Sequence, residues 1–268
     1  MAKLRALFIG GSGVISSACS RVAVDSGIEL FVLNRGRNTT RPLPPGVSML
    51  RADMREPKSV RDVVNDLEFD AVVDWVAFTP EQVRTDIDLF RGRTGQYVFI
   101  SSASAYQTPP ARMPVTESTP LRNPYWQYSR DKIACEDLLV AAYREEGFPA
   151  TIVRPSHTYD ETLVPFDGGW TVLGRMLAGK PVIVPSDAIA VADPEWGAGL
   201  LGDKAHSMMF DNAKLRAIVP GWRAVIPFER GARQIVQWYL ADPARQVTDA
   251  ALDAVMDKLA AAWYLEAL

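Results

Sequence analysis

The sequence predicts an α/β protein: a doubly wound parallel sheet followed by a small, mostly helical C-terminal lobe. Short runs rich in β-branched and aromatic residues alternate, from the N-terminus, with segments whose apolar residues recur at helical spacing. The runs are continuously apolar, as expected of strands buried on both faces. Strands and helices that alternate in this way need right-handed crossovers, which produce a parallel sheet whose ligands bind at the carboxyl ends of its strands.

Each element of the sheet domain can be placed from the pattern. The expected strands, in chain order, are Leu4–Ile9, Leu30–Leu33, Val47–Leu50, Ala71–Val76, Tyr97–Ile100 and Thr151–Val153. The expected helices start at Val14 and end at Gly27, extend around Val60 to Leu67, and span Pro80–Phe90 and Tyr125–Glu146. Because the first run continues into a glycine-rich turn, we interpret it as a strand and not as a secretion signal.

The pattern changes after Pro155, where proline and glycine interrupt the chain often. The expected helices of this part are Trp170–Ala178, Phe228–Leu240 and Asp249–Leu265, the last opened by Thr248 as its N-cap. We therefore expect a sheet domain over residues 1–155 and a shortened lobe for substrate over residues 156–268.

The composition excludes several classes of protein. Hydrophobic residues make up 48% of the 268 residues and charged residues 23%, which is typical of a globular protein. With 29 basic and 32 acidic residues, the net charge of −3 argues against a protein whose main task is to bind nucleic acid. Two cysteines without metal-ligand spacing and two histidines predict neither a disulfide framework nor a metal site. Without a long apolar run, we expect a cytoplasmic location and no membrane span.

A glycine-rich turn lies between the first strand and the first helix. It consists of Gly10, Gly11, Ser12 and Gly13. Backbone N–H groups of such a turn, together with the positive end of the following helix, bind the pyrophosphate of a dinucleotide. The position of the turn in the pattern therefore predicts a dinucleotide-binding, Rossmann-type domain.

The residues after the second strand bear on the choice of dinucleotide. Where an acidic residue usually binds the ribose of NAD, this chain has Asn34 and Arg35, with Arg37 and Arg41 close behind. An arginine pairs with the 2′-phosphate of NADP, so we expect NADP somewhat more than NAD, although Asn34 still offers a partner for a ribose hydroxyl. Asp53, after the third strand, is expected either to accept from the adenine amino group or to cap the next helix.

A tyrosine and a lysine four residues apart form the candidate catalytic pair. Tyr128 and Lys132 fall on one face of the helix expected over Tyr125–Glu146. A nearby ammonium stabilises a phenolate, which makes tyrosine a usable proton acceptor. Upstream, the strand Tyr97–Ile100 runs into Ser101, Ser102 and Ser104, whose hydroxyls either hold a substrate oxygen or cap the strand end.

Taken together, these motifs resemble the extended short-chain dehydrogenase/reductase family, the NAD-dependent epimerases and dehydratases of nucleotide sugars. The resemblance implies that Ser102, Tyr128 and Lys132 are catalytic and that Ser104 and His157 face the substrate. It also implies a cofactor site that consists of Gly10, Gly11, Ser12, Gly13, Val14, Ile15, Asn34, Arg35, Asp53, Met54, Val76, Ala77, Phe78, Tyr128, Lys132, Pro155 and Ser156. The helices Pro80–Phe90 and Tyr125–Glu146 resemble the family's dimer-forming pair, so a homodimer is possible by analogy.

The chain departs from the family pattern at three places. Ser16 replaces the third glycine, as in divergent members that include RNA-binding proteins. Ala103 and Ser104 stand where dehydratases place an Asp-Glu pair, so we expect no elimination of water. Between Val184 and Ser186 the resemblance skips a stretch that in the family supplies a late strand and part of the lobe, which leaves a natural short lobe and a deletion form both open.

The function predicted from these residues is an NAD(P)-dependent oxidoreductase or epimerase. Tyr128 would serve as general acid and base at a hydroxyl or ketone of a sugar or nucleotide-sugar-like substrate, with hydride transfer to or from nicotinamide. The alternative is a non-catalytic regulatory or RNA-binding protein that kept the dinucleotide fold. We expect a small-molecule substrate, no metal, no membrane partner and no nucleic acid.

Overall fold

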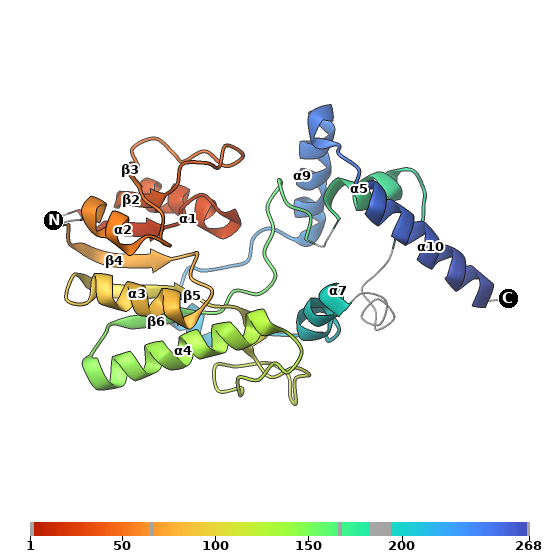
Figure 1. Cartoon of the computed structure of the whole chain (residues 1–268). Helices are drawn as coiled ribbons and strands as arrows, with labels where there is room; N and C mark the ends of the chain where they lie inside the picture. The colour runs from red at the N-terminus through yellow and green to blue at the C-terminus, as the bar shows by residue number, and fades with distance from the viewer. Residues whose placement is uncertain (1–2, 65–66, 166–167, 183–193, 267–268) are drawn as a thin grey trace.

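A six-stranded parallel sheet forms the N-terminal part of the computed structural model, which describes residues 3–64, 67–165, 168–182 and 194–266. Its strand order is β3-β2-β1-β4-β5-β6, and Figure 1 shows helices packed along it. The strands are β1 (Arg5–Ile9), β2 (Glu29–Asn34), β3 (Ser48–Arg51), β4 (Phe69–Asp74), β5 (Thr94–Ile100) and β6 (Ala150–Val153). This order reverses between β1 and β4, so the predicted doubly wound, Rossmann-type sheet is confirmed.

The helices follow the predicted alternation and continue into the C-terminal part. Those of the sheet domain are α1 (Val14–Asp25), α2 (Pro57–Val64), α3 (Pro80–Phe90) and α4 (Gln127–Glu146). Those of the C-terminal part are α5 (Gly169–Leu177), α7 (Pro194–Gly199), α8 (Ala213–Ile218), α9 (Phe228–Leu240) and α10 (Ala250–Glu266). The mostly helical character of the C-terminal part is thus confirmed, and the domain boundary at residue 155 stays a prediction.

The two faces of the sheet are buried by different helices. Leu7 and Ile9 point into a core that includes residues of α2, α3 and α4. Their neighbours Ala6 and Phe8 point to the other face, where they pack with Ala23 of α1. Because successive residues of a strand alternate between faces, a strand covered on both sides must be continuously apolar, as β1 is.

The second face is less completely covered at one end of the sheet. Thr151 and Val153 of β6 point to this face and are exposed, Val153 to 43%. On the opposite face, Ala150 and Ile152 of the same strand pack against the core. In the described part of the chain, α1 therefore covers β1 and β2 while the end at β6 stays open.

Two predicted boundaries move in the sheet domain, and hydrogen bonds explain the first. Strand β4 ends at Asp74 because its carboxylate Oδ1 accepts the N–H groups of Val76 and Ala77, at 2.6 and 2.8 Å, which turns the chain out of the sheet. Helix α4 begins at Gln127, two residues later than expected.

The prediction that Thr248 caps the last helix is wrong. The side chain of Asp249 does so, because its Oδ1 accepts the N–H groups of Ala251 and Leu252 at 2.9 and 3.1 Å. A carboxylate in this place also interacts favourably with the helix dipole, so it competes well with a neighbouring threonine.

The helices of the C-terminal part pack around a small core of their own. Val164, Leu173, Ile235 and Tyr239 are buried together, which joins α5 to α9. Arg175 of α5 is buried and forms ion pairs with two aspartates of α10. The interruption predicted between Val184 and Ser186 lies outside the described residues.

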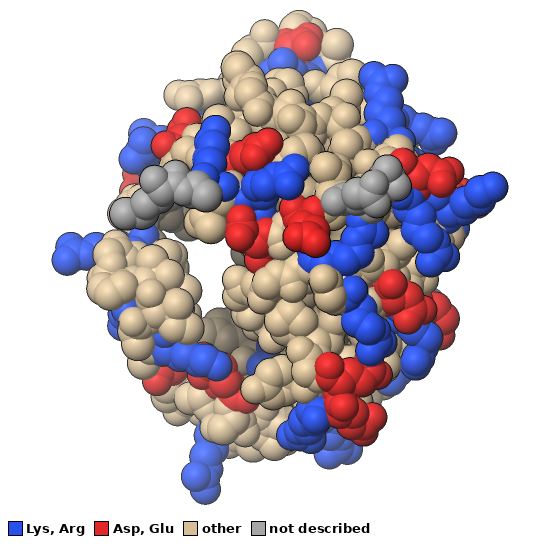
Figure 2. All heavy atoms as spheres, turned by 90° about the vertical axis from the view of Figure 1, so that its left-hand side faces the viewer, with Lys and Arg blue, Asp and Glu red and all other residues tan. Residues whose placement is uncertain are grey.

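Two features of the surface bear on partners. Within the described ranges, no helix is both long and apolar enough to cross a membrane. On the face drawn in Figure 2, Lys and Arg side chains alternate with Asp and Glu side chains. Helices α3 and α4 pack against each other (Figure 1), and a homodimer through this pair stays a prediction.

Candidate functional site

The glycine-rich turn packs closely on two valine side chains. Gly10 has a φ of +89°, and a Cβ there would lie 2.4 Å from Cγ1 of Val76. A Cβ on Gly11 would lie 2.7 Å from Cγ2 of Val32. These clashes require glycine at both positions, because a side chain would displace Val76, which follows β4, and Val32 of β2. The turn therefore has the close backbone approach that a pyrophosphate site needs.

Ser16, in the place of the family's third glycine, holds this turn together. Its hydroxyl donates to the carbonyl oxygen of Gly10 and accepts the N–H of Gly13, both at 2.7 Å. The residue is 1% exposed, and both bonds are partly buried. The serine is thus compatible with the turn, and it also occupies one backbone donor that a glycine would leave unbonded.

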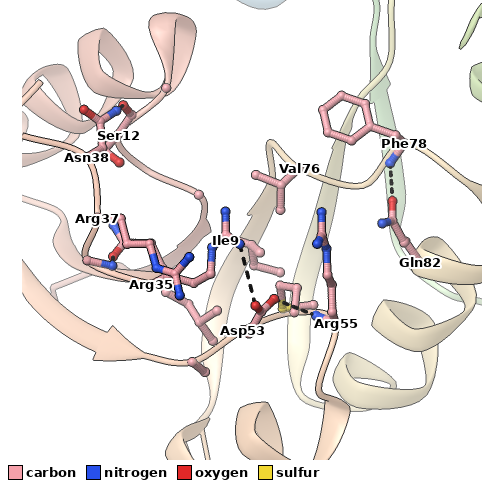
Figure 3. A pocket seen from close by; sticks show the side chains of 17 residues that line it. Ile9, Ser12, Arg35, Arg37, Asn38, Asp53, Arg55, Val76, Phe78 and Gln82 are labelled. Carbon is pink, nitrogen blue, oxygen red and sulfur yellow. Dashed lines mark hydrogen bonds and ion pairs between the residues drawn. The ribbon is translucent and has the colours of Figure 1, made fainter. Parts of the chain in front are cut away.

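A cavity of about 410 Å³ lies between this turn and the ends of β2 and β3. Figure 3 shows the side chains around it. Its lining includes the following residues predicted for the cofactor: Gly10, Ser12, Gly13, Asn34, Arg35, Asp53, Met54, Val76 and Phe78. Of the other predicted cofactor residues near the turn, Gly11 and Ala77 are buried and do not line this cavity.

Three arginines give this first cavity a positive character. Arg35, Arg37 and Arg55 line it, and Asp53 lies between Arg35 and Arg55 in Figure 3. The Asp53 carboxylate is 3.7 Å from Nη1 of Arg35, and its other oxygen accepts the N–H of Arg55 at 3.0 Å. Asp53 therefore lines the cavity, as its predicted use at the adenine requires, whereas the N–H that it binds belongs to the turn before α2, so Asp53 does not cap that helix.

Arg41 does not belong to this cavity, contrary to the grouping expected from the sequence. Its guanidinium forms a two-point ion pair with Asp160, at 2.6 and 3.1 Å, and contacts the Thr162 hydroxyl. Both partners are largely buried, so Arg41 ties the loop after β2 to the chain beyond β6. The carboxylate lies far along the sequence, which is why the pairing could not be foreseen.

A second cavity of about 300 Å³ adjoins the first, since Phe78 lines both. It contains the predicted Ile15, Ser102, Tyr128, Lys132, Pro155, Ser156 and His157. Val14, by contrast, lines neither cavity. The two cavities together follow the carboxyl ends of the strands, where ligands of doubly wound sheets bind.

Lys132 is the most buried charge of the second cavity. Its Nζ donates to the carbonyl oxygens of Ala77 and Ile100, at 2.7 and 2.8 Å, and lies over the rings of Phe78 and Phe99. Burial lowers the pKa of Lys132 to about 8. An ammonium group has three donors, so one remains for a ligand or for Tyr128.

Tyr128 lies one helical turn before Lys132, whose Nζ is 5.8 Å from the centre of its ring. Burial raises the pKa of Tyr128, and a hydrogen bond with the Ser102 side chain opposes the rise. The ring also packs on Trp126, with ring centres 4.6 Å apart. The hydroxyl, the phenol and the ammonium that the sequence predicted as a group thus lie together.

Ser104 occupies a different place from the one expected. It is 2% exposed and lies outside the lining of both cavities. Its hydroxyl contacts the hydroxyls of Ser102, at 2.9 Å, and Ser129, at 2.8 Å. The geometry therefore makes Ser104 a support for Ser102 and not a residue that touches substrate.

Sequence reasoning missed several residues of the second cavity. Trp75, Trp126, Thr158 and Asp203 line it. Asp203 comes from the π-helical turn Leu200–Lys204, far along the chain, and no motif marks it. Trp126, two residues before Tyr128, could have been found from its place at the start of α4. Within the described residues, no three His, Cys, Asp or Glu side chains are grouped so as to hold a metal ion.

Comparison with known families agrees with this geometry. The model of the NAD dependent epimerase/dehydratase family matches residues 6–191. The chain belongs to this family, which confirms the resemblance seen in its motifs.

Two curated relatives are similar in sequence to part of this chain. A UDP-glucose 4-epimerase from Lactobacillus helveticus is 27% identical over 168 residues, 56% of this chain and 51% of the relative. A 2'-dehydrokanamycin reductase from Streptomyces kanamyceticus is 30% identical over 193 residues, 70% of this chain and 53% of the relative. The chain therefore spans about half the length of these relatives.

Solved structures show the same fold. A dTDP-glucose 4,6-dehydratase from Bacillus anthracis in complex with NAD matches with a TM-score of 0.70 and 16% identity, over 90% of this chain and 98% of that one. The enzyme WbmG of Bordetella bronchiseptica in complex with NAD matches with a TM-score of 0.66 and 17% identity, over 93% and 98%.

Proposed function

We propose that the chain is an NAD(P)-dependent oxidoreductase or epimerase that acts on a hydroxyl or ketone of a sugar or nucleotide-sugar-like substrate. The observation that carries the proposal is that Ser102, Tyr128 and Lys132 line the second cavity, which adjoins the first cavity, the one at the glycine-rich turn. The related epimerase and reductase support the same class of reaction.

The residues around the first cavity fit a dinucleotide. Gly10 and Gly11 let the turn pack closely on Val76 and Val32, and Ser12 and Gly13, just before α1, line the cavity where a pyrophosphate would meet backbone N–H groups. Met54, Val76 and Phe78 offer apolar surface for flat rings, and Asn34 and Asp53 offer oxygens for hydroxyl and amino groups. When bound, the nicotinamide would supply the hydride acceptor or donor.

Side chains of the protein would carry out the proton transfer. Tyr128 would take the proton of a substrate hydroxyl, or give it back to a carbonyl oxygen. Burial raises the pKa of Tyr128, and the hydrogen bond with Ser102 opposes this rise. Ser102 would hold the same substrate oxygen, with its hydroxyl oriented by Ser104. Lys132 would stabilise the phenolate by its charge and hold a ribose hydroxyl with its remaining donor.

Elimination of water is not part of this proposal. Ala103 lines the second cavity at the place where a dehydratase would need a carboxylate, and Ser104 is buried beneath it. A methyl group and a hydroxyl cannot serve as the acid and base pair. The proposed reaction therefore stops at oxidation, reduction or inversion.

Arginines at the first cavity favour NADP within this proposal. Arg35, Arg37 and Arg55 surround the end of β2, where the 2′-position of the adenosine ribose would lie. Two of them have no carboxylate partner in the described part of the chain, so a phosphate would neutralise charges that are otherwise unpaired.

The test compares Tyr128→Phe with the wild-type chain. A panel of nucleotide sugars and of their keto forms would be assayed with NAD(H) and NADP(H), while cofactor binding is followed by calorimetry. We expect loss of turnover by at least about a hundredfold with nearly unchanged cofactor binding, since only the proton-transferring hydroxyl is removed.

Tyr125→Phe is the matched control, because this tyrosine is near the same helix start and is 39% exposed. It should keep wild-type turnover. If Tyr128→Phe turned over substrate as fast as the wild type, the proposed enzyme would be disproved and a binding protein without catalysis would be favoured instead.

A further inference from the structure

The π-helical turn Leu200–Lys204 is fixed against the start of α4. Gly202 is buried, and a Cβ there would lie 2.7 Å from Cβ of Trp126. The buried amide of Asn123 donates both to the carbonyl oxygen of Gly202, at 2.7 Å, and to that of Ser104, at 2.8 Å. One side chain thus connects the turn to the segment that carries Ser102. Such turns often occur at functional sites because they redirect single side chains.

Two side chains of this turn, Asp203 and Lys204, form a polar cluster with His157 at the second cavity. The ammonium of Lys204 is 2.7 Å from Nδ1 of His157 and forms an ion pair with Asp203. The Asp203 carboxylate is 4.0 Å from the same ring nitrogen. Asp203 and His157 line the cavity with Tyr128, and the charge of Asp203 adds to burial in raising the pKa of Tyr128. The cavity therefore carries charged and polar groups besides the predicted catalytic ones.

The cluster offers a hydrogen-bond acceptor beside donors. The contacts described for Asp203 use Oδ2, so its Oδ1 is available as an acceptor within the described part of the chain. Lys204 supplies donors next to it. A hydroxyl group donates one hydrogen bond and accepts others, so it suits this pair better than a carbonyl, which only accepts, or an ammonium, which only donates.

We infer that Asp203, with Lys204 and His157, recognises a second hydroxyl on the carbon next to the one that reacts at Tyr128. The inference rests on the proposed function and deepens it, because it assigns the substrate class as a vicinal diol on a ring. Trp126 would cover the apolar face of that ring, since it packs on Tyr128 and lines the same cavity. Neither the motifs nor the spacing of the sequence marks Asp203 or Lys204.

The test uses two small probes that differ by one hydroxyl, trans-cyclohexane-1,2-diol and cyclohexanol. Their binding to the purified chain with NADH present would be measured by saturation-transfer NMR, which needs no turnover. We expect the wild type to bind the diol about tenfold more tightly than cyclohexanol, because one extra hydrogen bond to a charged group is formed. Asp203→Asn should lose this preference and leave cyclohexanol binding unchanged.

Two further variants make the test specific. Lys204→Gln should reduce the diol preference in the same direction, which guards against a folding defect of one variant. Glu229→Gln removes a charge from an exposed residue of α9 outside the second cavity, and should keep the preference. If Asp203→Asn, with a wild-type melting temperature, still preferred the diol, the inference would be overturned.

The outcomes also separate this inference from the proposed function. A wild type that prefers the diol, together with an Asp203→Asn variant that does not, supports the recognition cluster even if no nucleotide sugar is turned over. In that case only the catalytic proposal fails. Equal binding of both probes by the wild type overturns the inference, whatever the turnover assay shows.

Discussion

Lys132 donates a hydrogen bond from its ammonium group to the carbonyl oxygen of Ala77, 2.7 Å away. A second bond reaches Ile100 at the end of β5, so one side chain of α4 joins the chain ends beyond β4 and β5. The contacts hold the floor of the second cavity in place. They also explain why a lysine is tolerated here although it is 2% exposed: its donors are satisfied, and aromatic rings lie against its charge.

Replacement of Lys132 should show how its buried charge makes the unfolding free energy depend on pH. Burial lowers the pKa of Lys132 from 10.5 to about 8, so the folded chain releases this proton at lower pH than the unfolded chain does. Below pH 8 the cost of the buried charge is fully present, and it disappears as pH rises toward 10.5. The unfolding free energy of the wild type, minus that of Lys132→Met, should therefore increase between these pH values in urea titrations.

The same variant tests catalysis. Lys132→Met should lower turnover by about a hundredfold or more, since the phenolate loses its nearby positive charge. Lys58→Met, at an exposed lysine of α2, is the control and should alter neither turnover nor the pH dependence of stability. A flat difference curve for Lys132→Met would contradict the assigned burial of the charge.

Ser16 offers a test of the glycine-rich turn. Ser16→Ala removes one hydroxyl that bonds both Gly10 and Gly13, and leaves two partly buried backbone groups without that partner. We expect a loss of about 1–3 kcal/mol of unfolding free energy, measured in urea. Ser118→Ala, at an exposed hydroxyl, should change stability far less. Equal stability of Ser16→Ala and wild type would mean that water replaces the serine.

The fold could be predicted from local patterns because its determinants are local. Continuous apolar runs gave the strands, and the helix Pro80–Phe90 is reproduced residue for residue. At two places where the prediction erred, one polar side chain decides where the element begins or ends. Asp74 turns the chain out of β4 by binding two backbone N–H groups, and Asp249 takes the cap expected of Thr248.

The site was predictable only where its residues fall close together in sequence or follow a known motif. Tyr128 and Lys132 share a helix face, and the serines end a strand, so their meeting follows from the topology. Arg41 was misassigned because its partner Asp160 is distant in sequence, and Asp203 was missed for the same reason. Ser104 was misplaced because the spacing does not tell which serine hydroxyls point inward.

The ion pair between Arg41 and Asp160 should give the protein acid sensitivity. Burial by itself would raise the pKa of Asp160, but the hydrogen bonds from Arg41 and Thr162 outweigh it, so the pKa is lowered. The stability that this carboxylate contributes is thus fully present above its pKa in the unfolded chain. It is lost as the pH falls from that pKa through the lower pKa of the folded chain.

Asp160→Asn removes this dependence, so its stability should decline less steeply in acid than that of the wild type. Thermal melts over the acid range would show this as a smaller fall in Tm. Asp137→Asn, at an exposed aspartate of α4, should follow the wild-type curve. Parallel curves for Asp160→Asn and wild type would show that the pair does not form in solution.

Two arginines that are close in sequence should differ in their effect on cofactor choice. Arg35 lines the first cavity, whereas the guanidinium of Arg41 is held by Asp160. Arg35→Ala should weaken NADPH binding about tenfold, because a charge-assisted hydrogen bond to the 2′-phosphate is lost, and should leave NADH binding nearly unchanged. Arg41→Ala should lower stability while it preserves the ratio of the two affinities. Calorimetric titration of each variant with both dinucleotides measures that ratio, and an Arg35→Ala chain that still binds NADPH as tightly as the wild type would reassign phosphate recognition to Arg37 and Arg55.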